Sequence, residues 1–345
     1  MRKLQRGFLT FGLIILCGIQ ILYGSPQSGE DFFTTETDTT YIKNFKHLLT
    51  ARYYLLAQNT SLVIFPDLSS TMNYQPNETG RFGIAAFYSW FGLGLSFGTK
   101  YFRKNSDIYG TTKSLDFRVN AYGKFMAVEG YLQYYQGFYM DYKSTAFKET
   151  FIIPGMDLIS FGVDGTYIYN YGKFSIRASY TQNERQKKSA GSLIVKPTFR
   201  YYYINSDTGI IPGKIMDIYS LKQENILSGD FYTLGLGPGY IYTLVFGKNF
   251  YITAGGMLEM NWSSYNYTTT EESYTKTGFS FPVSVRAAIG YNSDVWFIGG
   301  SFLSTLYYFQ PGQRVQDDFH YHLTQIRFWV GTRFNAFKRW NKKKQ

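Results

Sequence analysis

LTQIRFWVGTRFNAF, residues 323–337, is the stretch that decides the fold. Neighbouring side chains on a strand point to opposite faces, so every second residue shares a face. The mainly apolar face consists of Thr324, Ile326, Phe328, Val330, Thr332, Phe334 and Ala336. The more polar face consists of Leu323, Gln325, Arg327, Trp329, Gly331, Arg333 and Asn335. The run is longer than both a typical soluble strand of ~5–6 residues and the ~9–11 residues that cross a bilayer. This pattern predicts a strand with lipid on one side and a polar interior on the other.

The same two-sided pattern recurs along the 345-residue chain from about residue 48. Aromatic residues make up 20% of the chain, with 33 Tyr and 31 Phe, and 34 Gly accompany them. We therefore predict an all-β fold, a transmembrane antiparallel β-barrel of the outer membrane, formed by residues 46–337. The alternative, a soluble all-β protein, is disfavoured by the strand length and the lipid-like faces.

The lengths of the connections predict the number of strands, because outer-membrane barrels have short turns at one end and longer loops at the other. Short and long connections alternate along this chain except across residues 205–230. An added strand at 211–222 restores the alternation and gives 14 strands, with both termini periplasmic. If 205–230 is a loop or small helix, the count is 12. The pattern also predicts a strand at 173–182.

The N-terminal region carries targeting signals. Residues 1–24 are typical of a secretory signal peptide, in which basic residues precede an apolar run at 9–23. Residues 25–45 are polar and acidic, and we predict a disordered periplasmic leader. The only cysteine, Cys17, lies within the signal, so cleavage leaves no thiol and no disulfide. We expect the mature protein in the cell outer membrane after signal-peptide cleavage.

The net charge of +11 is partly explained by a basic C-terminal tail, residues 338–345. The basic residues of this tail are Lys338, Arg339, Lys342, Lys343 and Lys344. The remainder of the mature chain shows no basic helix and no nucleic-acid motif, so nucleic acid is excluded as a partner. A basic tail of this kind suits a membrane edge near anionic lipid.

Several short blocks of sequence resemble a known family. The blocks are NYQPN at 73–77, FGI at 82–84, SWFGLGLSF at 89–97, GTTKSLDF at 110–117 and YYQGFY at 134–139. They are similar to a Bacteroidota family of outer-membrane-type proteins described as domain of unknown function 4421. The resemblance covers residues 40–337 and implies an outer-membrane barrel, and it carries no catalytic residues across. The NYQPN block is interpreted as a structural loop rather than a binding site.

Charged residues on the polar faces are expected inside the barrel, because an arginine or lysine that faces lipid costs ~2–4 kcal/mol at the bilayer midplane. The predicted lumen-lining residues are Arg52, Asp116, Arg118, Glu129, Asp164, Arg177, Lys196, Arg200, Glu259, Arg286, Arg327 and Arg333. Basic members outnumber acidic ones, so the lumen is predicted to be net-positive. Ion-pair ladders that fill a closed lumen are the favoured interpretation, and a porin-like pore for anions is the alternative.

The sequence offers no convincing catalytic or metal-binding constellation. His320 and His322 would share a strand face, but no further ligand set completes a metal site. His47 has no serine in a recognisable pattern around it, and the glycines at 235–239 lack the strand–helix context of a nucleotide loop. We expect no enzyme activity, no cofactor and no bound metal.

The predicted role is therefore a structural or channel-like barrel with a net-positive lumen. Two alternatives are an interaction or assembly barrel for surface or export partners, and a lipid-modifying enzyme. Expected partners are outer-membrane lipid, small anionic solutes and a protein partner that binds the outer loops, taken as 139–155 and 263–275.

Overall fold

The computed structural model describes residues 37–67, 69–123, 125–219, 225–309 and 319–336. Long strands dominate it and form one wall. In chain order they are β2 (Leu49–Asp67), β4 (Gly80–Tyr88), β5 (Phe91–Gly98), β6 (Lys113–Tyr122), β7 (Met126–Lys143), β8 (Lys148–Ile168), β10 (Ala190–Ser206), β11 (Ile226–Phe246), β12 (Phe250–Leu258), β13 (Met260–Thr269), β14 (Ser273–Ser280), β15 (Val283–Asn292), β16 (Trp296–Phe309) and β17 (Phe319–Phe334).

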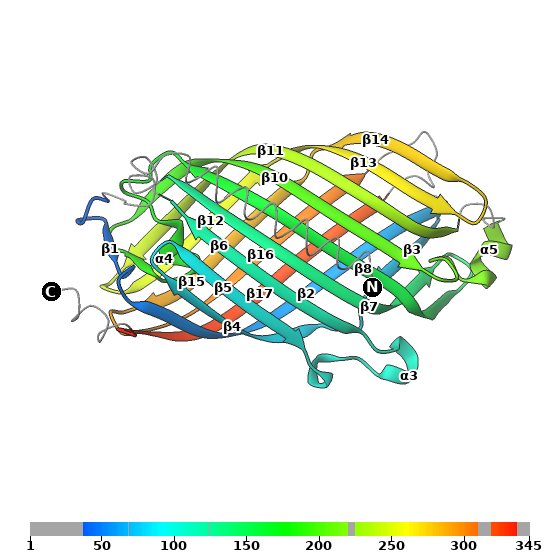
Figure 1. Ribbon diagram of the computed structural model, residues 1–345, viewed down its shortest axis with the longest axis horizontal. Helices are drawn as coiled ribbons and strands as arrows, with labels where there is room; N and C mark the ends of the chain where they lie inside the picture. The colour runs from blue at the N-terminus through cyan, green and yellow to red at the C-terminus, as the bar shows by residue number, and fades with distance from the viewer. Residues whose placement is uncertain (1–36, 68, 124, 220–224, 310–318, 337–345) are drawn as a thin grey trace.

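Neighbouring strands of this wall pair antiparallel, and the last strand pairs with the first. β17 aligns with β2 from Phe334 opposite Leu49 to Phe319 opposite Ile64, which closes the sheet into a barrel (Figure 1). β12 and β13 form one path broken at Glu259, and β14 and β15 form one path broken at residues 281–282. Counted in this way, twelve strands make the ring in the described part of the chain. The predicted all-β antiparallel barrel is confirmed.

The expected count of 14 strands is wrong for the residues that the structure describes, and the alternative count of 12 holds. At 211–222, where a strand was expected, α5 (Gly213–Tyr219) follows Pro212, whose fixed φ suits the start of a helix. At 173–182, α4 (Ile176–Tyr180) replaces the expected strand. The Ser175 hydroxyl accepts a hydrogen bond from the Ala178 N–H and caps this helix.

The two expected outer loops are hairpins instead. Residues 139–155 belong mainly to β7 and β8, which pair as far as Lys143 opposite Lys148. Residues 263–275 belong mainly to β13 and β14, which pair as far as Thr268 opposite Ser273. The wall therefore continues beyond the level at which loops were predicted.

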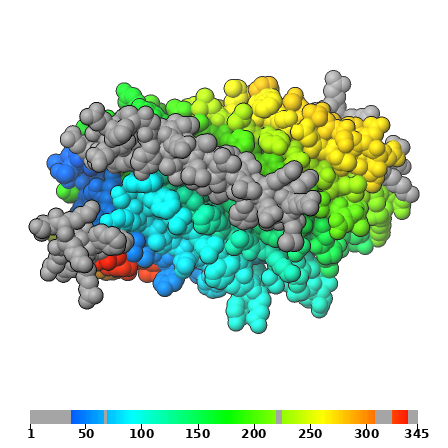
Figure 2. Space-filling model, viewed as in Figure 1, coloured from blue at the N-terminus to red at the C-terminus, as the bar shows by residue number. Residues whose placement is uncertain are grey.

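The two ends of the barrel differ in their connections. At the end where β2 begins and β17 ends, short connections at 89–90, 123–125, 247–249 and 293–295 join the strands. We call this the turn end, and it lies at the left in Figure 1. At the opposite end, the loop end, the 99–112 segment with η1 (Lys100–Phe102) and α3 (Ser106–Tyr109) projects from the wall (Figures 1 and 2).

A short strand rearranges the wall at the loop end. β3 (Ser70–Gln75) pairs with β2 on one side and with β7 on the other. It thereby takes the place of β4, β5 and β6, which end before reaching this level. The ring consequently has fewer strands at the loop end than in the middle of the barrel.

The outer surface of the barrel is apolar and the inner surface is largely polar. On β17, Phe328, Val330 and Phe334 are 61%, 51% and 46% exposed, whereas Trp329 and Arg333 are buried inside. The same alternation marks β4, whose Phe82 and Ile84 face outward while Arg81 faces inward. The two-sided pattern of the sequence is thus reproduced around the wall. No helix in the described ranges is long and apolar enough to span a bilayer.

Candidate functional site

The turn end of the barrel is occupied by chain folded back into the lumen. Residues 169–189 leave the wall between β8 and β10 and form α4 and β9 (Glu184–Gln186). β9 pairs antiparallel with β1 (Ile42–Asn44), which precedes the first wall strand. We call residues 37–48 and 169–189 together the plug. The expected disordered leader therefore differs from the structure at 37–45, because these residues pack into the plug; residues 1–36 lie outside the described part.

One side of the plug packs against the wall through apolar side chains. Phe174 and Ile176 of the plug form a buried cluster with Ile168 of β8 and Ile194 of β10, the strands between which the plug leaves the wall. Ile241 of β11 joins the same cluster. This side also carries the covalent attachment of residues 169–189, while residues 37–48 are attached to β2.

The other side of the plug is held by single polar groups of the wall. The Arg333 Nε donates to the Gln182 carbonyl at 2.8 Å, and its guanidinium lies 4.1 Å from the centre of the Phe45 ring. Arg333 therefore touches both parts of the plug. Nη1 of Arg52 donates to the Tyr180 carbonyl at 2.5 Å, and the Asn292 amide donates to the Ala178 carbonyl at 3.2 Å.

Short-range hydroxyl contacts complete this polar side. The Ser179 hydroxyl lies 2.6 Å from the Thr253 hydroxyl and 3.3 Å from the Thr243 hydroxyl. The Tyr251 hydroxyl donates to the Ser179 carbonyl at 3.0 Å. These are neutral hydrogen bonds, each of which contributes about 1 kcal/mol net because water offers an equivalent partner.

Charged groups also tie the plug together. Glu184 on β9 faces Lys46 at 3.3 Å and Arg177 at 3.5 Å, and it accepts a hydrogen bond from the Ser175 hydroxyl at 2.6 Å. Arg177, predicted on a wall strand, thus lies in α4 and serves the plug. At the outer rim, Asp294 pairs with both Lys43 and Arg185 at 2.8 and 2.9 Å. The hydrogen bond from Lys43 lowers the pKa of the Asp294 carboxyl, and the positive charges of Arg185 and Lys43 act in the same direction.

Above the plug, the middle of the lumen holds a cavity of about 160 Å³. Predicted lumen residues that line it are Arg52, Arg118, Glu129, Asp164, Lys196, Arg200, Arg286 and Arg327. Asp116 and Glu259 lie behind this lining, fully buried, and bind the cations in front of them. Ten of the twelve residues predicted to line the lumen thus lie around the central cavity. The other two, Arg177 and Arg333, lie at the plug.

Two buried networks of ion pairs lie along the wall of the central cavity. In the first, Arg81 contacts Glu78 at 2.5 Å and Asp116 at 3.5 Å, and Arg118 contacts Asp116 at 2.9 Å. Gln133 donates a further hydrogen bond to Asp116. This network contains two carboxylates and two cations, so it is neutral. The second network has the same numbers of carboxylates and cations and is also neutral. Arg81 and Glu78 were absent from the predicted set, because Glu78 follows the NYQPN block rather than lying in a strand.

The second network stands where the β12–β13 path is broken. Lys196 contacts Asp164 at 2.9 Å and Glu259 at 3.9 Å. Arg200 contacts the same two carboxylates at 3.3 and 3.4 Å. Glu259, the residue at the break, keeps its backbone N–H bonded to the Pro282 carbonyl of the neighbouring path. The break therefore places a carboxylate inside the lumen without losing that hydrogen bond.

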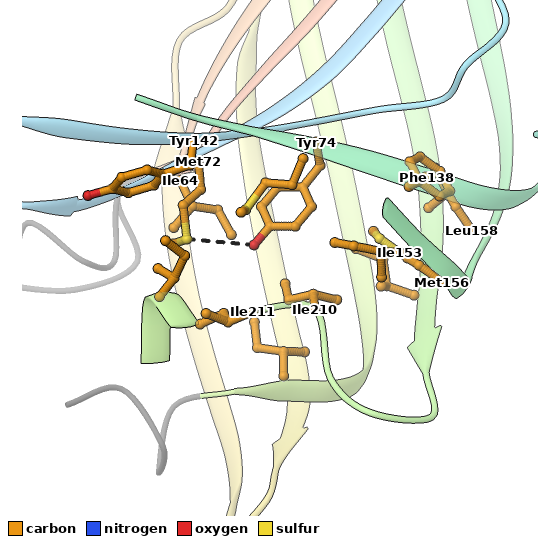
Figure 3. Close-up of a cluster of buried hydrophobic side chains, with 14 of the residues drawn as sticks. Ile64, Met72, Tyr74, Phe138, Tyr142, Ile153, Met156, Leu158, Ile210 and Ile211 are labelled. Carbon is orange, nitrogen blue, oxygen red and sulfur yellow. Dashed lines mark hydrogen bonds between the residues drawn. The ribbon is translucent and has the colours of Figure 1, made fainter. Parts of the chain in front are cut away.

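The loop end of the lumen is apolar, which the sequence did not predict. A buried cluster fills it, and its members include Ile64, Met72, Tyr74, Phe138, Met156, Leu158, Ile210 and Ile211 (Figure 3). Ile210 and Ile211 approach from the segment between β10 and α5, and the Tyr74 hydroxyl lies 3.7 Å from the Met72 sulfur. A cavity of about 80 Å³ remains among these side chains, and Tyr202 lines both this cavity and the central one.

The apolar cluster had a signal in the sequence. Near the loop end of β7, Phe138, Tyr139 and Met140 are all buried, so both faces of the strand are covered there. A strand covered on both faces shows a continuous apolar run rather than alternation. Reading such runs as the end of the lipid-facing pattern would have located the cluster.

The other chemical candidates remain isolated in the structure. His47 is an exposed residue of the plug, and no group of three His, Cys, Asp or Glu side chains gathers in metal-binding geometry among the described residues. Asn77 of the NYQPN block is buried, and its amide donates to the Gly110 carbonyl at 2.7 Å and the Lys104 carbonyl at 3.2 Å. Asn77 therefore fastens the projecting 99–112 segment, but the block is not a loop as predicted, because Asn73, Tyr74 and Gln75 lie in β3.

Comparison with known proteins places the sequence in a family. The sequence model of the family described as domain of unknown function (DUF4421) matches residues 36–331. No curated protein matches the chain.

Similar solved structures are of low identity. The translocator domain of autotransporter NalP from Neisseria meningitidis is 14% identical, with 86% of this chain and 90% of that chain covered and a TM-score of 0.39. The outer membrane protease OmpT from Escherichia coli is 8% identical, with 85% and 98% covered and a TM-score of 0.33. The KdgM porin in complex with disordered oligogalacturonate is 9% identical, with 81% and 99% covered and a TM-score of 0.29.

Proposed function

The chain belongs to the family described as domain of unknown function (DUF4421), and from its geometry we propose a gated outer-membrane channel for small anionic solutes. In this proposal the plug keeps the lumen shut at rest. The proposed role is not enzymatic. It combines the channel-like function expected from the sequence with the closed lumen expected from the ion networks.

Several features support an outer-membrane location. A closed ring leaves no unpaired sheet edge, which is the form in which strands can cross a lipid bilayer. The outer face presents large apolar side chains, and short turns gather at one end. Because periplasmic turns are the short ones in outer-membrane barrels, we assign the turn end to the periplasm. A signal peptide at residues 1–24 would deliver the chain to that compartment.

The observation that carries the gating proposal is the unequal attachment of the plug. The apolar contacts of residues 169–189 and their covalent links to the wall lie on the side of β8 and β10, whereas residues 37–48 run directly into β2. The opposite side is held by hydrogen bonds from Arg52, Asn292 and Arg333 to plug carbonyls. Water can replace such a hydrogen bond at a net cost of about 1 kcal/mol for the neutral Asn292 donor and about 1.5–3 kcal/mol for an arginine donor, whereas apolar burial resists separation. Residues 169–189 would therefore swing about the side at which they leave the wall.

The test is single-channel recording of refolded protein in a planar bilayer of defined lipid. We expect the native protein to be mostly silent and Arg333→Ala to show frequent openings with anion preference. Arg333→Lys is the matched control, because it keeps the charge but loses the forked contact to Gln182 and Asn292. It should open less often than Arg333→Ala.

A reversible lock makes the experiment sharper. The mature chain is expected to contain no cysteine, so Ser179→Cys with Thr253→Cys introduces one pair across the plug and the wall, where the native hydroxyls are 2.6 Å apart. In the Arg333→Ala background, oxidation of this pair should abolish the openings and reduction should restore them. Openings that persist in the oxidised pair, or silence in a correctly folded Arg333→Ala barrel, would contradict gating by the plug.

A silent barrel would favour the second role, interaction or assembly. The 99–112 segment and the long β7–β8 and β13–β14 hairpins at the loop end are the surfaces that such a partner would meet. Co-purification of a partner with the native protein, lost on deletion of residues 100–109, would support that role. The third role, a lipid-modifying enzyme, predicts altered lipopolysaccharide or phospholipid profiles on overexpression.

A further inference from the structure

The central cavity contains more positive than negative charge once the ion networks are set aside. Arg81 and Arg118 are neutralised by Glu78 and Asp116, and Lys196 and Arg200 by Asp164 and Glu259. Three arginines and one carboxylate remain on the cavity wall. They are Arg52, Arg286, Arg327 and Glu129. Among the described residues none of these four forms an ion pair, so the cavity carries a net excess of two positive charges.

The three arginines come from one sector of the wall. Arg327 of β17 lies opposite Ser301 of β16, and Arg286 of β15 lies opposite Leu303, two residues along the same strand. Both arginines therefore face the cavity on either side of β16 at nearly the same height. Arg52 comes from β2, the neighbour of β17 on the other side. The result is an arc of guanidinium groups along a third of the lumen.

These guanidinium groups have unused donors. The buried Nε atoms of Arg52, Arg286 and Arg327 have no hydrogen-bond partner in the structure. Two of them lie over aromatic rings, Arg327 at 5.2 Å from the Tyr54 ring centre and Arg286 at 5.4 Å from that of Tyr180. A cation–π contact of this kind uses no N–H donor, so it leaves these Nε donors available. Edge donors in a forked arrangement are what carboxylates and phosphates bind.

We infer that the central cavity is a binding site for one compact dianion, a phosphate-type oxyanion or a short dicarboxylate, held by Arg286 and Arg327. Uncompensated buried charge is unfavourable without a counter-charge, and an anion with two negative charges balances the excess. A cavity of about 160 Å³ holds an anion of a few heavy atoms together with water and excludes a nucleotide or a sugar chain. Tyr180 and Thr181 of the plug form part of the lining, so the site is complete only when the plug is seated.

This inference deepens the proposed function and rests on it for the route by which the anion enters. Its test is separate from conductance. The native protein is refolded in detergent in the presence of radiolabelled phosphate, so that the anion enters before the plug closes, and free phosphate is removed by gel filtration. We expect about one phosphate per chain to stay bound, and unlabelled succinate present during refolding to compete with it better than chloride at the same concentration.

Removal of a positive charge and removal of a negative charge should change phosphate binding in opposite directions. This difference separates a binding role of these residues from a structural one. Arg327→Gln and Arg286→Gln should each weaken phosphate binding roughly tenfold or more, since a charge-assisted hydrogen bond is lost. Glu129→Gln removes the opposing carboxylate and should tighten binding. Lys148→Gln, which removes one exposed positive charge at the far end of the wall, should bind phosphate as the native chain does.

Three results would overturn this inference. A native barrel that retains neither labelled phosphate nor labelled succinate contains no such site, whatever its conductance. Equal retention by Arg327→Gln, Arg286→Gln and Lys148→Gln shows that the label is bound elsewhere. Competition by chloride equal to that by succinate rules out a dianion. Retention that follows the predicted order in a barrel that never conducts supports the site and contradicts the gated channel.

Discussion

Asp116 shows how a single buried carboxylate organises the lumen. It is fully buried and contacts Arg118, Arg81 and Gln133. Arginines without a counter-charge in such a place are costly, because the protein cannot solvate them as water does. The sequence placed Asp116 and Arg118 on the inner face from strand alternation alone. It could not place Arg81 beside them, because that contact joins strands through the fold.

Replacing Asp116 with Ala should therefore destabilise the barrel by about 3–5 kcal/mol, the cost of leaving a buried charge unpaired. The free energy of unfolding would be measured by urea titration of the refolded protein with tryptophan fluorescence. Lys148→Gln is the control and should change this free energy by less than about 0.5 kcal/mol, as exposed substitutions usually do. A loss below about 1 kcal/mol for Asp116→Ala would mean that water enters and solvates the two arginines.

The ion pairs of Asp294 at the rim of the turn end predict that the melting temperature of the protein depends on pH. The folded pKa of Asp294 is lowered, so its ion pairs stabilise the protein above the ordinary carboxyl pKa of about 4 and are lost as the pH falls through the lowered value. The native protein should thus melt at a higher temperature than Asp294→Asn at neutral pH, by a small margin because the carboxyl is exposed. The difference should vanish in acid. A difference that grows in acid would contradict this assignment.

At the scale of elements, strand alternation was a reliable guide where lipid and lumen form the two faces. The strand predicted at 323–337 corresponds to β17 for this reason. It failed at 173–182, where an alternating run became α4, because a capping serine and contacts inside the lumen outweighed the period-two pattern. The strand expected at 211–222 rested instead on connection lengths, and it is wrong because a helix follows Pro212 there. The plug could not be predicted, since it depends on what the closed wall encloses, and the apolar loop end left only the continuous apolar run near the end of β7 as its signal.

Close contact between neighbouring strands predicts an asymmetric response to two glycine substitutions. A Cβ added at Gly83 of β4 would lie 2.0 Å from the Tyr54 ring, whereas one added at Gly94 of β5 would meet nothing nearer than 3.7 Å. Gly83→Ala should therefore destabilise the barrel by about 1–3 kcal/mol through overpacking, and Gly94→Ala should not. Both would be measured by the same urea titration. Equal effects of the two substitutions would show that Tyr54 moves freely.

At the scale of the whole molecule, a continuous ring of hydrogen bonds should resist detergent. We expect the refolded protein to migrate faster on a gel before boiling than after it, because the closed sheet stays compact in dodecyl sulfate until heat separates the strands. Truncation after residue 318 removes β17 and leaves β2 and β16 unpaired at the seam. That variant should migrate identically before and after boiling. A native chain whose migration ignores boiling would contradict the closed ring.

The position of Arg333 near the C-terminal end of β17 sets an order of assembly. The guanidinium that fastens the plug reaches its place only when the last strand has joined the first, so the mouth is sealed at the final step of closure. A nascent or truncated cylinder would then leak at its turn end, while a completed one is sealed. Retention of solute in vesicles would thereby report whether biogenesis has finished.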